Sequence, residues 1–224
     1  MTGAVSPALQ ATFEQERAAA RARKPGDPAA ARTETVRMYG RLAELQAGII
    51  ASQPVKTECE RGCSYCCHLR VEIRPHEAFV LAHHIQSRFS AAERKLVLAR
   101  LEDNLKRIAP LSAAQHIRAG IACALLHDGV CSVYAGRPAT CRKYYSVSVD
   151  TCRAAYQDTA APLRGPIEDD NLRLAGNAVA LGFAKGMEEA GYDTSLHELH
   201  DALYRALTNP KAEKRYRDGK KAFV

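Results

Sequence analysis

The sequence contains no tryptophan, and aromatic residues occupy only 6% of its 224 positions. Much of its apolar content is alanine, which favours closely packed helices over a β-sandwich. No stretch approaches the length of a membrane span, and the first ten residues, MTGAVSPALQ, lack the basic and apolar regions of a signal peptide. We therefore expect a cytoplasmic protein with no membrane partner.

Motifs of several enzyme classes are also missing. The chain has no phosphate-cradling glycine loop, no dinucleotide-binding fingerprint and no Ser-His-Asp set. Basic residues outnumber acidic ones, which gives a formal net charge of +7. This charge would suit nucleic acid, phosphate or an acidic protein face, although a solvated, arginine-rich surface is the more ordinary explanation.

All the cysteines lie between residues 59 and 152, and four of them fall within the stretch CERGCSYCC. The cytoplasm keeps thiols reduced, so disulfides explain them poorly. Thiolates instead suit zinc, cuprous copper and iron in clusters. We predict one metal-binding nucleus built from two sequence-distant halves, and its ligand candidates are Cys59, Cys63, Cys66, Cys67, Cys123, Cys131, Cys141 and Cys152.

The cysteine spacing leaves the number of metal sites open. Cys63 and Cys66 are separated by two residues and can grip one ion from a tight turn. The thiols could fill two four-sulfur sites, or one site could be metallated while the others are buried or redox-active. In an extended backbone Cys66 and Cys67 would point to opposite faces, so we expect their sulfurs to serve different sites, or one of them to pack in the core.

The spacing Cys59-x3-Cys63-x2-Cys66 also matches radical S-adenosylmethionine enzymes, in which three cysteines hold a [4Fe–4S] cluster. That class needs strands and helices alternating after the motif. Here helical patterns follow the motif without such alternation, which argues against a radical enzyme.

Apolar spacing and turn signals predict a mainly α protein with a small β-hairpin at the cysteine-rich metal site. A short strand is expected at residues 69–73, and a basic tail after residue 209. The last helix would begin at a capping box opened by Ser195. Helices are expected at residues 8–23, 29–52, 75–85, 90–110, 112–121, 138–142, 167–190 and 195–208.

We expect three regions along the chain. Residues 1–53 would form a helical N-terminal arm, and residues 54–160 a cysteine-cluster metal-binding domain. Residues 161–224 would form C-terminal helices that pack on the same domain and end in the basic tail.

The predicted hairpin spans Cys123 to Tyr134, with Asp128-Gly129 at its turn. A two-residue turn would place Cys123 and Cys131 on opposite faces, whereas a three-residue turn would place them on one face. Gly129 can take the left-handed position that a three-residue turn needs. We therefore predict the three-residue turn.

Motifs across residues 59–152 resemble a known family. They comprise Cys-x-x-Cys-Cys at 63–67, Glu77 and Leu81 in the following helix, Cys123 before an apolar hairpin, Cys-Ser-Val-Tyr at 131–134, and Arg-Pro-x-x-Cys-Arg at 137–142. This set is similar to the YkgJ-type cysteine-cluster family of zinc- or iron-chelating proteins, which includes flagellin lysine N-methylases. The resemblance implies that the chain binds zinc or an iron–sulfur cluster, and it fixes no reaction.

Arg137 and Arg142 flank Cys141 and are candidate cofactor-binding residues. Their guanidinium groups could donate to cluster sulfurs or bind an acidic ligand, although a surface role explains them equally well. His68 adjoins the cysteine doublet and could replace a cysteine as ligand.

The sequence therefore favours a cytoplasmic metalloprotein that binds an iron–sulfur cluster or Zn²⁺ through thiolates and serves in redox chemistry or metal handling, with a possible protein partner. One alternative is an enzyme resembling a protein-lysine N-methyltransferase. The other is a zinc-stabilised module that binds nucleic acid or an acidic protein.

Overall fold

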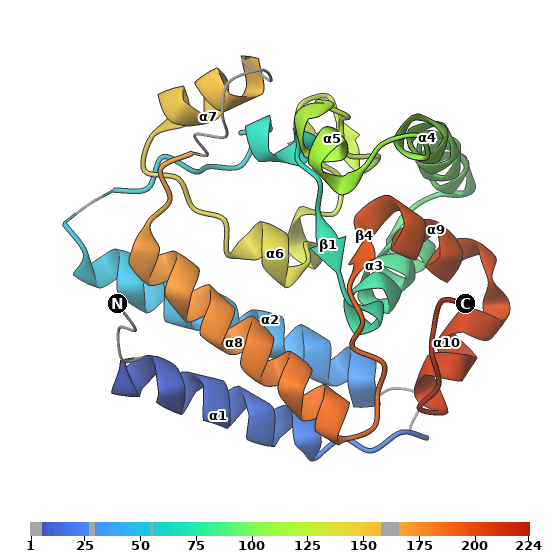
Figure 1. Cartoon of the computed structure of the whole chain (residues 1–224), viewed down its shortest axis with the longest axis horizontal. Helices are drawn as coiled ribbons and strands as arrows, with labels where there is room; N and C mark the ends of the chain where they lie inside the picture. The colour runs from blue at the N-terminus through green and yellow to red at the C-terminus, as the bar shows by residue number, and fades with distance from the viewer. Residues whose placement is uncertain (1–5, 27–29, 55, 158–165) are drawn as a thin grey trace.

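The computed structural model describes residues 6–26, 30–54, 56–157 and 166–224. Within these ranges the chain is mainly α, as predicted, with two small two-stranded antiparallel sheets (Figure 1). The helices are α1 (Pro7–Arg21), α2 (Ala30–Ser52), α3 (Pro75–Arg88), α4 (Ala91–Ile108), α5 (Ala113–Arg118), α6 (Ala139–Arg142), α7 (Val149–Gln157), α8 (Asp170–Glu189), α9 (Leu199–Thr208) and α10 (Pro210–Arg217). The strands are β1 (Glu72–Ile73), β2 (Leu126–His127), β3 (Val130–Cys131) and β4 (His197–Glu198), and the 3₁₀ turns are η1 (Tyr65–His68) and η2 (Tyr134–Gly136).

Two predicted features fall partly beyond the described ranges. These are the start of the helix expected at residues 29–52 and the boundary at residues 160–161. No helix in the described ranges is long and apolar enough to cross a membrane.

Helices α1, α2 and α8 lie side by side and form one flank of the molecule (Figure 1). Two glycines of α8 allow α1 to approach it closely. A Cβ on Gly182 would lie 2.3 Å from the carbonyl oxygen of Phe13, and a Cβ on Gly186 would lie 2.2 Å from that of Arg17. Both distances are far below van der Waals contact, so the two backbones touch where these residues have no side chain.

Local capping signals set several helix boundaries as predicted. Ser90 and Glu93 form a reciprocal capping box at the start of α4. The Glu93 nitrogen lies 3.2 Å from the Ser90 hydroxyl oxygen, and the Ser90 nitrogen lies 2.7 Å from the Glu93 carboxylate. Pro75 occupies the first position of α3. Gly191 follows α8 with φ +95°, and the Tyr192 N–H bonds to the Met187 carbonyl across it at 3.0 Å.

The expected capping box at Ser195 is wrong. Residues 197–198 form β4, which pairs with β1 through Glu72–Glu198 and Ile73–His197. Helix α9 therefore starts three residues later, where the Glu198 carboxylate accepts the Asp201 N–H at 3.1 Å. Ser195 instead bonds to the Asp193 side chain.

The basic segment after residue 209 forms a packed helix, although the sequence predicted only a tail. Asn209 caps α10 by accepting the Lys211 N–H at 3.0 Å, and Pro210 is its first residue. Tyr216 and Phe223 then lie beside Phe79 of α3, with ring centroids 5.4 and 5.6 Å away. The charged residues of this segment face outward while its apolar residues join the core.

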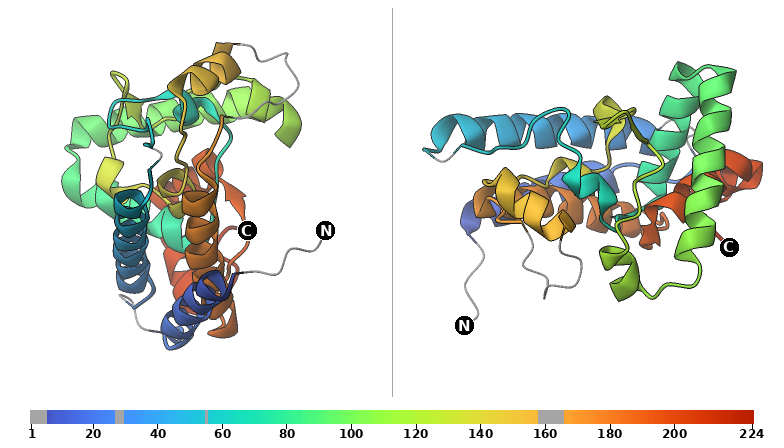
Figure 2. Two further views of the ribbon diagram at one scale, coloured as in Figure 1. Left: turned by 90° about the vertical axis from the view of Figure 1, so that its left-hand side faces the viewer. Right: turned by 90° about the horizontal axis from the view of Figure 1, so that it is seen from above.

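The cysteine region lies at the other side of the molecule and consists mostly of short segments and loops (Figure 1). It contains η1, α5, the β2–β3 hairpin, η2, α6 and α7. Helix α7 packs against η1 and was not predicted from the sequence. The same region is seen from two further directions in Figure 2, where α7 lies apart from the long helices.

Candidate metal centre

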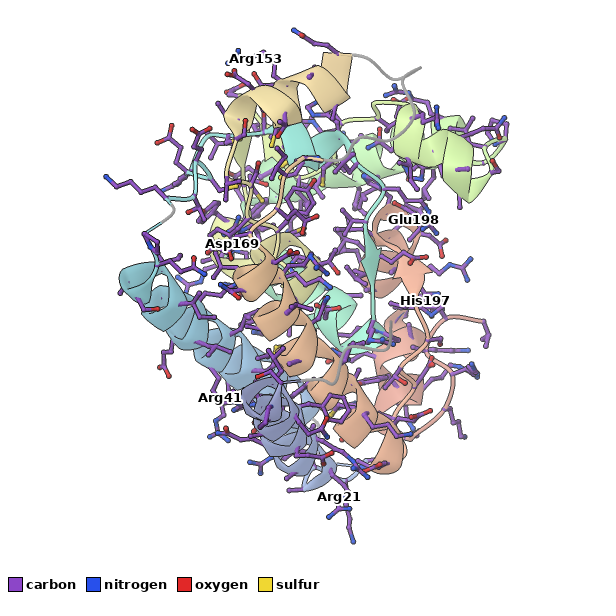
Figure 3. The ribbon with its side chains drawn as sticks, turned by 60° about the vertical axis from the view of Figure 1, so that its left-hand side comes forward. Arg21, Arg41, Arg153, Asp169, His197 and Glu198 are labelled. Carbon is purple, nitrogen blue, oxygen red and sulfur yellow. The ribbon has the colours of Figure 1, made fainter. Side chains whose placement is uncertain are left out.

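The two halves of the cysteine sequence lie together in the structure. The Cys123 N–H donates to the Cys67 carbonyl at 2.8 Å, and the Glu58 N–H donates to the Ser146 carbonyl at 3.0 Å. The Ser146 N–H in turn donates to the Cys59 sulfur at 3.1 Å. In Figure 3, sulfur atoms gather below the helix that carries Arg153. Backbone hydrogen bonds therefore bring together cysteine segments that are far apart in sequence.

The Cys66-Cys67 doublet does not have the extended backbone that we expected. Both residues lie in η1, and the Cys67 N–H bonds to the Ser64 carbonyl at 2.9 Å. The neighbouring Cys67 thiol, together with burial, raises the pKa of the Cys66 thiol. The doublet therefore presents two neighbouring sulfurs, because a 3₁₀ turn does not alternate its side chains as a strand does.

Four thiols form what we call the inner set: Cys66, Cys123, Cys131 and Cys141. After burial, the largest influences that raise the pKa of Cys141 are Cys123, Cys66 and Cys131. Burial and then the Cys123 and Cys66 thiols also raise the pKa of Cys131. Burial raises the pKa of Cys123 to about 11, with Glu198 and Cys66 contributing. These mutual effects indicate that the four thiols lie in one region of the structure.

Three further thiols form the outer set: Cys59, Cys63 and Cys152. Burial raises the pKa of Cys59, with added contributions from Cys66, Cys152 and Cys63. Burial likewise raises the pKa of Cys152, and Cys63 and Cys66 add to it. Cys66 influences both sets and therefore lies between them.

The electrostatics of these thiols favour a cation among them. All the cysteines are free thiols, and burial is the main reason that most of their pKa values are raised. Several thiolates side by side repel one another, so losing their protons becomes favourable only when positive charge arrives. Arg137 supplies part of that charge. Its guanidinium acts to lower the pKa values of Cys66, Cys131 and Cys141, in opposition to burial and the neighbouring thiols, which raise them.

The predicted three-residue hairpin turn is wrong. Leu126 pairs with Cys131 and His127 with Val130, so the turn has two residues. Asp128 and Gly129 have φ values of 49° and 75°, the left-handed pair of a type I′ turn, whose twist matches the strands.

Cys123 and Cys131 nevertheless remain neighbours. Strand β2 begins only at Leu126, whose N–H bonds back to the Cys123 carbonyl at 2.9 Å. Residues 123–126 therefore form a turn and do not alternate their side chains as a strand does. For this reason a two-residue hairpin turn does not place Cys123 and Cys131 on opposite faces.

Glu77 holds the short helix that carries Cys141. Its buried carboxylate accepts the Ala139 N–H at 2.8 Å and the Arg74 N–H at 3.1 Å, with the Tyr39 hydroxyl at 3.4 Å. Burial raises the pKa of this carboxyl while the hydrogen bonds oppose that shift. Ala139 is the first residue of α6, so Glu77 fixes the start of the Cys141 helix to α3.

His200 holds the loop that carries Cys123, which the sequence did not indicate. Its Nε2 accepts the Ala124 N–H at 3.2 Å and lies 3.2 Å from the Asn104 amide nitrogen, while its Nδ1 lies 2.7 Å from Glu198. Among the described residues, the three ligand atoms within 4.8 Å of one another belong to His116, Glu198 and His200. Both ring nitrogens of His200 are already hydrogen-bonded, so this group positions the loop and is not an open metal site.

The two arginines singled out from the sequence have different surroundings. The Arg137 guanidinium lies 3.6 Å from the Tyr134 ring centroid and influences the inner set. Arg142 lies over Tyr39 at 4.5 Å and donates through Nε to the Arg137 carbonyl at 2.6 Å. His68 stacks on Tyr156 with ring centroids 4.6 Å apart, and its Nδ1 lies 3.1 Å from the Ser64 carbonyl.

Thiols that are mostly half-buried come together here from distant chain segments, held by backbone and carboxylate hydrogen bonds. This is the arrangement of a metal-chelating domain. Residues 58–161 match the CxxCxxCC family model, described as "Putative zinc- or iron-chelating domain". The family resemblance inferred from the cysteine motifs is thereby confirmed over this part of the chain. No curated protein and no solved structure matches the chain at a significant level.

Proposed function

We propose that this protein is a cytoplasmic metalloprotein whose cysteines bind metal as thiolates in two adjacent centres, and that it acts in redox chemistry or metal handling. The observation that carries the proposal is the meeting of the cysteine segments: the Cys123 N–H bonds to the Cys67 carbonyl at 2.8 Å, and the half-buried thiols of the inner set raise one another's pKa values. Four such groups in reach of one another are a complete ligand set for one zinc ion or one iron–sulfur cluster.

The spacing of the sulfurs favours an iron–sulfur cluster. With zinc–sulfur bonds of about 2.3 Å in a tetrahedron, the four sulfurs of a zinc site lie roughly 3.8 Å apart. Yet the group of described residues whose ligand atoms come within 4.8 Å of one another contains no cysteine. In a [4Fe–4S] cluster each thiolate binds a different iron, so its cysteine sulfurs stand farther apart than those around a single zinc ion.

The remaining cysteines would form the second centre. Cys59, Cys63 and Cys152 supply three thiols, and Cys66 or the adjacent Cys67 lies between this set and the inner one. When bound, an iron–sulfur cluster supplies one-electron transfer. The chain itself contributes donors to the sulfurs, namely the Ser146 N–H at Cys59 and the positive charge of Arg137 near the inner set. Such donors stabilise the more negative state of a cluster.

Anaerobic purification with elemental analysis tests the proposal. We expect a brown protein that contains iron and sulfide, whereas a zinc–thiolate protein would be colourless. Cys141→Ser should remove the inner centre, and Cys152→Ser should weaken only the outer one. Metal content per chain and the visible spectrum distinguish the two losses.

A serine substitution at Cys66 completes the comparison, because Cys66 influences both sets. Its loss should affect both centres. A soluble, folded protein that contains no metal after anaerobic purification and iron or zinc reconstitution would contradict the proposal. Equal losses from Cys141→Ser and Cys152→Ser would contradict the division into two centres. Lysine methylation and a zinc-stabilised binding module remain predictions from the sequence.

A further inference from the structure

A basic pocket of about 650 Å³ opens beside Cys131. Its wall is formed by the end of α3, the first half of α4, the β2–β3 hairpin and the loop that carries Arg61. This volume lies within the range of about 300–1,000 Å³ that is usual for small-molecule sites. Among its lining residues, Cys131 belongs to the inner set and Ser132 bonds across the hairpin to the Leu125 carbonyl at 2.8 Å. Arg61 and Arg88 form none of the hydrogen bonds that hold the described cysteine segments together.

Three arginines line this pocket, and none of them forms an ion pair with a carboxylate of the described residues: Arg61, Arg88 and Arg100. Arg100 donates only to the Leu126 carbonyl, at 3.3 Å. The acidic residue in the lining, Glu93, is already bonded to Ser90 in the capping box of α4. With three arginines and one carboxylate in its lining, the pocket carries a net positive charge.

The same pocket has an apolar side. Phe89, Leu96 and Val97 line it, and Leu96 is 43% exposed. The Phe89 ring lies in an edge-on contact with His84, at 6.4 Å between centroids. Apolar side chains and several guanidinium groups in one pocket suit a ligand with one anionic end and one flat or apolar end.

We propose that this pocket binds a small phosphate ester with an aromatic part, of the size of a nucleoside diphosphate. Guanidinium groups pair with phosphate oxygens through two parallel hydrogen bonds, and Phe89 and Leu96 cover the aromatic part. Cys131 lines the pocket too, so the bound ligand lies directly beside the inner set. The binding site is defined by the arginines and does not depend on which metal the thiols hold.

Calorimetric titration of the full-length protein at low salt tests the site, with ADP, pyrophosphate, adenosine and citrate as probes. ADP should bind most tightly, because it alone uses both sides of the pocket. Arg88→Gln should weaken ADP binding about tenfold, since it removes a charge-assisted hydrogen bond. Arg107→Gln is the matched control, because both arginines are exposed and lie in the last turn of a helix. It should leave ADP binding within about twofold.

A second measurement uses the thiols of the reduced, metal-free protein. ADP should slow the alkylation of Cys131, read by peptide mass spectrometry, and leave that of Cys59 unchanged. Circular dichroism confirms that each variant is folded. Failure of ADP and pyrophosphate to bind would overturn the proposal, as would equal weakening by Arg107→Gln. Tighter binding of citrate, or binding of DNA or polyglutamate without ADP, would also overturn it. Because the thiol measurement uses metal-free protein, its outcome is separate from that of the metal analysis.

Discussion

The helical flank and the cysteine region are held together by different forces. In the flank, α2 and α8 bury many small and apolar side chains, and the backbones of α1 and α8 meet at Gly182 and Gly186. The buried Glu16 of α1 also pairs with Arg41 of α2 at 2.6 Å. In the cysteine region the joints are single hydrogen bonds, such as the one from the Ala139 N–H to Glu77 and the one from the Ala124 N–H to His200. Many small contacts make the flank stable, whereas a few polar contacts decide where the thiols lie.

The largest effect is expected in the flank, from Gly182→Ala. The new Cβ would lie 2.3 Å from the Phe13 carbonyl oxygen and 2.9 Å from its Cα, which are backbone atoms that cannot rotate away. We expect a loss of roughly 3 kcal/mol in the free energy of unfolding, measured with urea on metal-free protein. Metal content of the fraction that remains folded should be unchanged.

Gly48→Ala is the control for this substitution. Gly48 lies in α2 with nothing within 4 Å of its Cβ position. Alanine favours the helix there, so stability should rise by up to about 1 kcal/mol. If both substitutions had the same effect, close backbone contact would not be what holds the flank.

The next effect is expected at the joint between the two regions. Glu77→Ala leaves the Ala139 N–H buried without a partner, which costs about 1–3 kcal/mol, and frees the helix that carries Cys141. Glu77→Gln keeps an amide oxygen for that N–H and should cost less. Iron or zinc content measured per chain should fall in Glu77→Ala and largely persist in Glu77→Gln. Normal metal content in Glu77→Ala would show that α6 is held by its other contacts alone.

The elements of the two regions could be predicted from the sequence to different degrees. Helices such as α2 and α4 follow from apolar spacing and from caps such as Ser90, because these signals lie within a few residues of the structure that they specify. The cysteine region was predicted as a metal site from thiol chemistry alone. The geometry of this region was not predicted correctly. The Asp128-Gly129 turn permitted two strand registers, and the Cys66-Cys67 doublet lies in the 3₁₀ turn η1, where an extended backbone was expected.

Long-range polar contacts were beyond the reach of sequence patterns. The motif that includes Glu77 gives no sign that its carboxylate caps α6, and nothing near His200 indicates its bond to Ala124. The capping box at Ser195 had the expected residue types, yet pairing of β4 with β1 moved the start of α9 to Leu199. In each case a contact more than 60 residues away in sequence decides the outcome, so a local pattern cannot predict it.

A smaller effect depends on pH and on the core between the regions. Burial, with the charge of Arg74 nearby, lowers the pKa of His76 to about 3. The unfolded chain binds a proton near pH 6.5 while the folded chain does not, so the stability from this group is present above pH 6.5 and is lost as pH falls toward 3. The loss should be about 1 kcal/mol between pH 6.5 and 5.5, and it approaches about 1.4 kcal/mol per pH unit in the middle of that window.

Urea unfolding of metal-free protein at pH 6.5 and 5.5 measures this dependence. His76→Gln cannot take up the proton and should show a flatter pH profile. His83→Gln, at an exposed position of the same helix, should keep the wild-type slope. If His76→Gln kept that slope as well, other groups would be responsible for it.

The smallest effect is expected in the hairpin, from Gly129→Ala. Nothing lies within 4 Å of the Cβ position of Gly129, so the substitution meets no neighbour and acts only through its φ of 75°. A side chain in that left-handed conformation costs about 1 kcal/mol. A type I′ turn needs both central residues to be left-handed, and Asp128 already has φ 49°, so the turn cannot avoid this cost by changing its backbone conformation. The midpoint temperature of thermal unfolding should therefore fall by about 2–4 °C.

The metal content of Gly129→Ala should stay at the wild-type level, because Cys131 is placed by its pairing with Leu126 and Cys123 by a separate turn. A stability loss as large as that of Gly182→Ala, or loss of metal from folded protein, would mean that the turn itself positions the thiols.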